Sequence, residues 1–215
     1  MDSPHGNQPV VTRGQPLEAA VGAVILLHGR GASPEDILGL ADELKLSQLA
    51  YLAPEAAGHT WYPNSFLAPL ERNEPWLTSA LDLVAAIIER LGRVGFQHNR
   101  IALMGFSQGA CLATEFVARN AHRYAGLIAF TGGLIGPQGT TFRYSGDLAG
   151  TPCFLGSGDP DPHVPWDRVK ESASVLSALG GKLTLKPYPG MPHLISSDEV
   201  NEARQILSRL CHQRA

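Results

Sequence analysis

Short apolar segments alternate with helix-length segments along almost the whole chain of 215 residues, and this alternation is what most limits its fold. Strands that alternate with helices form a parallel sheet with helices on both faces. The apolar segments predict strands at 23–27, 49–53, 101–104, 127–131, 153–156 and 183–187. The helices are expected at 34–45, 75–91, 108–120, 165–179 and 198–210. We therefore predict a single α/β domain over residues 1–215, with a mostly parallel central sheet.

Composition and charge exclude several classes of function. The net charge is −3, so no basic face points to nucleic acid or to an anionic membrane surface. The apolar runs are far shorter than the roughly 20 residues that span a bilayer. Three scattered cysteines are not a disulfide framework, and the first 14 residues lack a signal-peptide pattern. We expect a cytoplasmic protein without membrane insertion and leave a homodimer open.

The segment Gly105-Phe106-Ser107-Gln108-Gly109 matches the pattern G-x-S-x-G and lies between a predicted strand and a predicted helix. In this context a sharp turn exposes the serine hydroxyl, and the small residues let the strand and the helix approach closely. The helix N-terminus adds positive potential beside a developing oxyanion. We therefore predict that Ser107 is a catalytic nucleophile and not an incidental serine in a glycine-rich turn.

A serine nucleophile needs a base, and enzymes with this turn supply the other groups in the chain order Ser, Asp or Glu, His. His193 follows the last predicted strand and is the expected base. His28 precedes the serine and breaks the order. Asp159 and Asp161 both follow the strand at 153–156, and spacing alone does not choose between them.

The segment His28-Gly29-Arg30-Gly31 follows the first predicted strand, where such enzymes place one backbone N–H donor to the oxyanion. The other donor is the N–H of Gln108, the residue after the predicted nucleophile. Each donor lowers the barrier by roughly 3 kcal/mol. The Arg30 guanidinium could contact a substrate carboxylate or point to solvent, and we expect it to point to solvent.

Four motifs, LHGRGAS, GFSQGA, GDPDPHVP and GMPH, together resemble the phospholipase/carboxylesterase family of α/β-hydrolases. This family includes small bacterial carboxylesterases and the acyl-protein thioesterases, and the motifs span residues 27–193 in its order. The resemblance implies the α/β-hydrolase fold and a triad of Ser107, Asp161 and His193. It selects Asp161 because the family's acid stands in a D-P-x-V-P pattern. It also implies that Arg30 and Gln108 supply the oxyanion amides.

The resemblance places a tryptophan-containing loop, here with Trp61, beside the pocket. We expect Trp61, Phe66 and Phe106 to wall an acyl pocket. At 215 residues the hydrolase core leaves little room for a separate cap domain, so we expect an open, shallow pocket suited to short acyl chains. The thioesterases often carry a hydrophobic residue where Arg30 stands, which argues against a long acyl substrate.

These observations predict a serine carboxylesterase that hydrolyses small, short-chain carboxylic esters through an acyl-enzyme on Ser107. No cofactor is expected, and the acidic and histidine residues near Asp161 lack the spacing of a metal site. An acyl-thioesterase or lysophospholipase of the same family is the alternative within this class. A hydrolase-fold binding protein with an idle triad is the alternative from another class.

Overall fold

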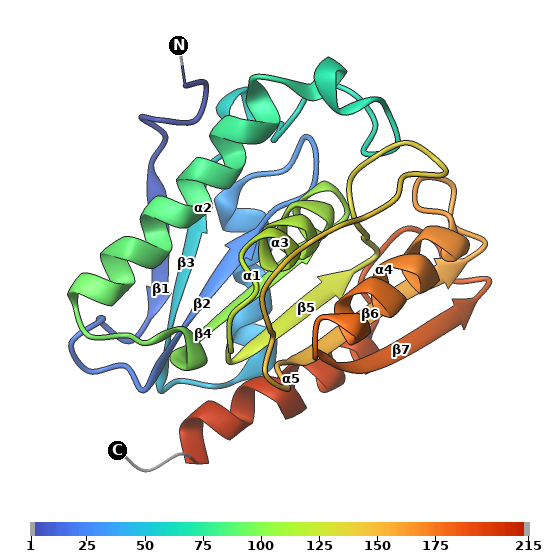
Figure 1. Cartoon of the computed structure of the whole chain (residues 1–215). Coiled ribbons are helices and arrows are strands. Elements are labelled where there is room, and N and C mark those ends of the chain that lie inside the picture. Colours follow the sequence, from blue (N-terminus) through green and yellow to red (C-terminus); the bar gives the residue numbers. More distant parts are fainter. Residues whose placement is uncertain (1–2, 213–215) are drawn as a thin grey trace.

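The computed structural model describes residues 3–212 and contains a seven-stranded sheet with helices on both faces (Figure 1). The strands lie side by side in the order β1-β3-β2-β4-β5-β6-β7. Their bounds are Val10–Gly14 for β1, Gly22–Leu27 for β2, Leu49–Pro54 for β3, Ile101–Phe106 for β4, Gly126–Phe130 for β5, Pro152–Asp159 for β6 and Lys182–Pro189 for β7. The α-helices are α1 Pro34–Leu44, α2 Trp76–Arg93, α3 Gln108–Arg119, α4 Trp166–Ala178 and α5 Ser197–His212. Short 3₁₀ helices span Ala57–His59, Leu70–Asn73 and His98–Arg100.

The predicted fold class is confirmed, and the sheet has one further strand, β1, at its edge. Strands β2 to β7 pair in parallel, whereas β1 pairs antiparallel with β3 at the sheet edge. The side chains of β1 are exposed or half-buried, so its sequence VVTRG lacks the continuous apolar run of a buried parallel strand. Each of the six predicted strands overlaps an observed strand, with bounds that differ by at most three residues. The five predicted helices agree with α1 to α5 to within two residues at each end.

Two buried clusters hold the helices against the sheet. Helices α2, α3 and α4 cover one face, and α1 and α5 cover the other (Figure 1). The central strands β2, β3, β5 and most of β4 are buried, which explains their near-continuous apolar sequences. Among residues 3–212 no helix has the length and apolar character required to cross a membrane.

The loops that follow the parallel strands meet at one edge of the sheet. The ends of β2 and β4 are level, because Leu27 pairs with Gly105. The ends of β6 and β7 are also level, because Asp159 pairs with Pro189. Between β2 and β4 the order of strands reverses direction, and such switch points open a crevice for ligands. The predicted triad and oxyanion residues follow these four strands.

Helix α1 begins directly after the loop at the end of β2, and its start is fixed by a capping box. The Ser33 hydroxyl accepts a hydrogen bond from the Asp36 backbone N–H, and the Asp36 carboxylate accepts one from the Ser33 N–H. Pro34 occupies the first helical position, where no N–H is needed. The cap therefore holds the far end of the predicted oxyanion loop.

Candidate active site

Ser107 lies at a strained turn between β4 and α3. Its backbone has φ 53° and ψ −116°, a combination that residues with a side chain rarely adopt. A side chain at Gly105 would overlap the backbone of Gly109, and one at Gly109 would overlap the Leu27 carbonyl oxygen. The two glycines of the motif are thus required by the close approach of α3 to β4 and β2.

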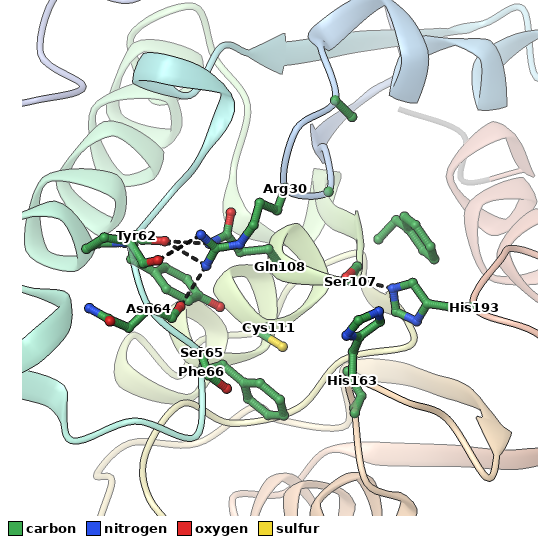
Figure 2. A pocket seen from close by; sticks show the side chains of 15 residues that line it. Arg30, Tyr62, Asn64, Ser65, Phe66, Ser107, Gln108, Cys111, His163 and His193 are labelled. Atoms are coloured by element: carbon green, nitrogen blue, oxygen red, sulfur yellow. Dashed lines mark hydrogen bonds between the residues drawn. The ribbon is translucent and has the colours of Figure 1, made fainter.

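A chain of hydrogen bonds joins the three residues of the predicted triad. His193 Nε2 lies 2.9 Å from Ser107 Oγ, and His193 Nδ1 lies 2.8 Å from Asp161 Oδ2. Ser107 follows β4, Asp161 follows β6 and His193 follows β7, so residues 86 positions apart meet at the sheet edge. Figure 2 shows the bond between Ser107 and His193 at the side of the pocket.

The Asp161 carboxylate is fully buried, with 0% of its side chain exposed, while 19% of the His193 side chain is exposed. The second carboxylate oxygen of Asp161, Oδ1, accepts hydrogen bonds from the backbone N–H groups of His163 and Val164, each 2.9 Å long. Burial opposes ionisation, yet the bonds from His193 and from these two N–H groups lower the pKa of Asp161 below its usual value. Asp161 is therefore placed to stay ionised beside the imidazole.

The other acidic and histidine candidates lie elsewhere. Asp159 is the exposed last residue of β6, and its side chain has no hydrogen-bond partner among residues 3–212. His28 is buried behind the loop after β2, where Nε2 accepts a hydrogen bond from the Ala56 N–H and Nδ1 bonds to the Gly29 carbonyl. Burial lowers the pKa of His28, which favours the neutral ring. The structure thus brings Asp161, and not Asp159, to His193.

The two predicted oxyanion donors flank the pocket beside Ser107. Arg30 and Gln108 both line the cavity, and within residues 3–212 their backbone N–H groups have no protein acceptor. The neighbouring groups of the loop are bonded: the Gly31 N–H donates to the His59 carbonyl, and the Trp61 indole N–H donates to the His28 carbonyl. The free amides are therefore held in place by bonded neighbours.

Arg30 is an exposed residue, but its guanidinium is bound by the protein and does not extend freely into solvent as expected. Its Nη atoms donate to the carbonyl oxygens of Tyr62, Pro63 and Asn64 at 2.6–2.9 Å, as Figure 2 shows in part. A planar guanidinium carries five N–H donors, so it can bind several carbonyls of one turn. Sequence alone gave no sign of this, because the loop that supplies the acceptors lies more than 30 residues away.

A cavity of about 460 Å³ opens beside Ser107. Phe66 and Phe106 line it, as predicted. The expectation that Trp61 walls the pocket is wrong: Trp61 is completely buried and is not among the lining residues. Its ring packs against His28 at a centroid distance of 4.9 Å, because its indole N–H bonds to the His28 carbonyl. Trp61 therefore contacts the predicted oxyanion loop on the side away from the cavity.

Several lining residues were not predicted. Tyr62, Cys111 and His163 face the cavity, with His163 edge-on to His193 at a ring-centroid distance of 4.9 Å (Figure 2). Burial raises the pKa of the Cys111 thiol to about 12, so this thiol stays protonated and unreactive. The position of His163 near the site follows from the sequence, because it stands two residues after Asp161. The orientation of Tyr62 depends on contacts that sequence does not reveal.

A seven-stranded α/β sheet with a serine on the turn after β4 and an acid and a histidine after β6 and β7 defines the class of α/β-hydrolase-fold serine hydrolases. Comparison with known proteins gives the family. The sequence profile described as phospholipase/carboxylesterase matches residues 7–211. The chain belongs to the phospholipase/carboxylesterase family and is a serine ester hydrolase.

A phospholipase/carboxylesterase structure from Dyadobacter fermentans is 44% identical in sequence and has a TM-score of 0.90. The alignment covers 94% of this chain and 97% of that one. Acyl-protein thioesterase 1 from Candida albicans is 26% identical, over 89% of this chain and 93% of its own length. The Bacillus cereus carboxylesterase, 19% identical over 95% of both chains with a TM-score of 0.74, shares the fold.

Proposed function

We propose that Ser107, His193 and Asp161 hydrolyse short-chain carboxylic esters through an acyl-enzyme. The proposal rests on the hydrogen-bonded chain from Ser107 Oγ through the imidazole to the buried carboxylate. His193 Nε2 takes the proton of Ser107 as the hydroxyl oxygen attacks the ester carbonyl. His193 then gives this proton to the leaving alcohol. A water molecule, activated by the same imidazole, releases the acid.

Asp161 serves this cycle by holding the proton of the neutral imidazole on Nδ1, which leaves Nε2 free to accept the serine proton. The carboxylate also stabilises the imidazolium that forms in the transition state. The backbone N–H groups of Arg30 and Gln108 stabilise the negative charge on the former carbonyl oxygen. Their lack of a protein acceptor within the described residues supports this role.

The proposed substrates are small carboxylic esters with short acyl chains. No cap structure covers the cavity within residues 3–212, and the cavity measures about 460 Å³. Phe66 and Phe106 give it an apolar wall for a few methylene groups. A thioesterase activity is the second candidate, because curated relatives of similar length are named acyl-protein thioesterase 1.

The two candidates are separated by a matched pair of substrates. Phenyl acetate and thiophenyl acetate carry the same acyl group and differ in the atom that leaves. A carboxylesterase gives a kcat/KM for the oxygen ester at least comparable to that for the thioester, after each is corrected for its uncatalysed rate. Turnover of the thioester alone would favour the thioesterase. Absence of both activities in the folded protein would contradict an ester hydrolase.

We also propose that the enzyme acts in the cytoplasm, since Cys111, Cys153 and Cys211 are all unpaired thiols. Its partner in this proposal is the small-molecule ester itself. A homodimer stays a prediction, which sedimentation or light scattering of the purified chain would test.

A further inference from the structure

The two residues whose backbone amides form the proposed oxyanion hole also meet through their side chains. Arg30 Nη2 donates to the Tyr62 carbonyl oxygen at 2.9 Å, and Gln108 Nε2 donates to the same oxygen at 2.8 Å. A carbonyl oxygen has two lone pairs, and this one accepts from both side chains. The Thr60 hydroxyl lies 2.9 Å from the same oxygen and 3.3 Å from Gln108 Oε1, so it can donate to either. We call this arrangement the Tyr62 carbonyl bridge; both side chains converge on Tyr62 in Figure 2.

The bridge belongs to a wider set of bonds between the same loop and the two donor residues. Gln108 Oε1 accepts a hydrogen bond from the Trp61 N–H at 3.0 Å, so its amide group binds both sides of the Trp61–Tyr62 segment. Arg30 also binds the carbonyls of Pro63 and Asn64. Gln108 is only 6% exposed, which shields its bonds from competing water.

The bridge joins two residues that share no backbone hydrogen bond and that lie three positions beyond the paired ends of β2 and β4, Leu27 and Gly105. Arg30 follows β2 and Gln108 begins α3, and the two residues are 78 positions apart. An oxyanion hole lowers a barrier only when its donors are already aimed at the developing charge, because reorganisation during the reaction costs free energy. The separation of the two amides therefore controls how well the hole fits a tetrahedral intermediate.

We propose that the Arg30 and Gln108 side chains are positioning residues that fix the separation of their own backbone amides through the Tyr62 carbonyl. They do not touch the reacting atoms. This inference rests on the proposed function, because it assumes that the two amides bind an oxyanion. It assigns Arg30 a role that its charge alone does not suggest, since its donors bind carbonyls of the protein.

The test replaces each side chain and leaves both backbone amides in place. Arg30→Met and Gln108→Met keep an unbranched side chain of similar length without hydrogen-bond donors, and the double variant removes the bridge. Single-turnover acylation by phenyl acetate is measured together with inhibition by a trifluoromethyl ketone, whose adduct carries a tetrahedral oxyanion. Arg204→Met is the matched control. Arg204 donates to the Glu43 and Leu44 carbonyls at the C-terminal end of α1, away from the site.

Each single variant should slow acylation about 10- to 100-fold, the loss expected for a donor displaced by up to an ångström, while KM changes little. Inhibition by the ketone should weaken in proportion to the loss of kcat/KM. The double variant should lose less than the product of the two single losses, because both side chains act on one carbonyl. Arg204→Met should lower thermal stability and leave acylation unchanged.

Lower melting temperatures with unchanged acylation and inhibition in both variants would overturn the inference, and so would losses confined to KM or fully multiplicative losses. Arg30→Lys gives a further check. A single ammonium cannot reproduce the fork of bonds to three carbonyls, so it should recover at most part of the rate. If the wild-type protein neither hydrolyses esters nor binds the ketone, the proposed function itself is wrong. Failure of this inference alone would leave both wild-type properties intact.

Discussion

Replacing Asp161 by Asn tests whether the buried carboxylate determines which ring nitrogen of His193 carries the proton. The Asp161 side chain receives three N–H donors: two backbone groups on Oδ1 and the imidazole on Oδ2. Asn has one oxygen, and the two fixed backbone donors of His163 and Val164 should claim it. The amide NH₂ then faces His193 Nδ1 and favours the tautomer with its proton on Nε2. That tautomer cannot accept the serine proton.

The expected loss in kcat is about 10⁴-fold, which corresponds to about 5.4 kcal/mol at 1.36 kcal/mol per factor of ten. The assay is hydrolysis of phenyl acetate at pH 7.5, with thermal unfolding to confirm that the variant folds. Asp159→Asn is the matched control: its side chain is exposed, so its rate should stay within about twofold of wild type. A loss below tenfold for Asp161→Asn, or a larger loss for Asp159→Asn, would refute the assignment.

Three further predictions concern the pocket, its support and pH. In a series of esters with acyl chains from C2 to C16, used below micelle-forming concentrations, kcat/KM should be highest at about two to six carbons. The reason is that the cavity can bury only a few methylene groups, each worth about 0.8 kcal/mol. An optimum at C12 or longer would contradict this prediction. Trp61→Phe removes the indole donor to the His28 carbonyl and should lower the free energy of unfolding by about 1–3 kcal/mol without changing the preferred chain length. A changed chain-length preference would show that Trp61 does line the pocket. Burial lowers the pKa of His5 and of His28, so the unfolded chain binds more protons and stability should fall as pH drops through about 6.5, the unfolded-state value. His5→Gln should make the pH dependence of urea unfolding between pH 7 and 5 shallower, and an unchanged slope would show that His5 does not contribute.

Most of the fold could be predicted because buried parallel strands have continuous apolar sequences. Strand β1 could not: it lies at the edge, and its residues Val10–Gly14 are half-buried or exposed. Ser107 was identifiable because its turn demands small residues at fixed positions, and overlap at Gly105 and Gly109 explains this demand. The sequence therefore predicts those strands and turns whose structure depends mainly on residues close together in the chain.

The choice between Asp159 and Asp161 came from the family resemblance, since the residues alone left it open. The structure gives the physical reason: Asp159 still belongs to β6, whereas Asp161 lies in the turn beyond it. The contacts of Arg30 and Trp61 could not be predicted, because their side chains bind segments about 30 residues away in the chain. Contacts between loops that meet only in the folded protein leave no pattern in sequence.

Covalent labelling of the nucleophile tests the mechanism most directly. A fluorophosphonate probe is added to the purified wild-type chain and to Ser107→Ala, and the labelled peptide is identified by mass spectrometry after digestion. The mechanism predicts stoichiometric labelling of Ser107 in the wild-type protein, no labelling of Ser107→Ala, and loss of ester hydrolysis by roughly 10³-fold or more in that variant. Labelling at another residue, or undiminished hydrolysis by folded Ser107→Ala, would contradict it.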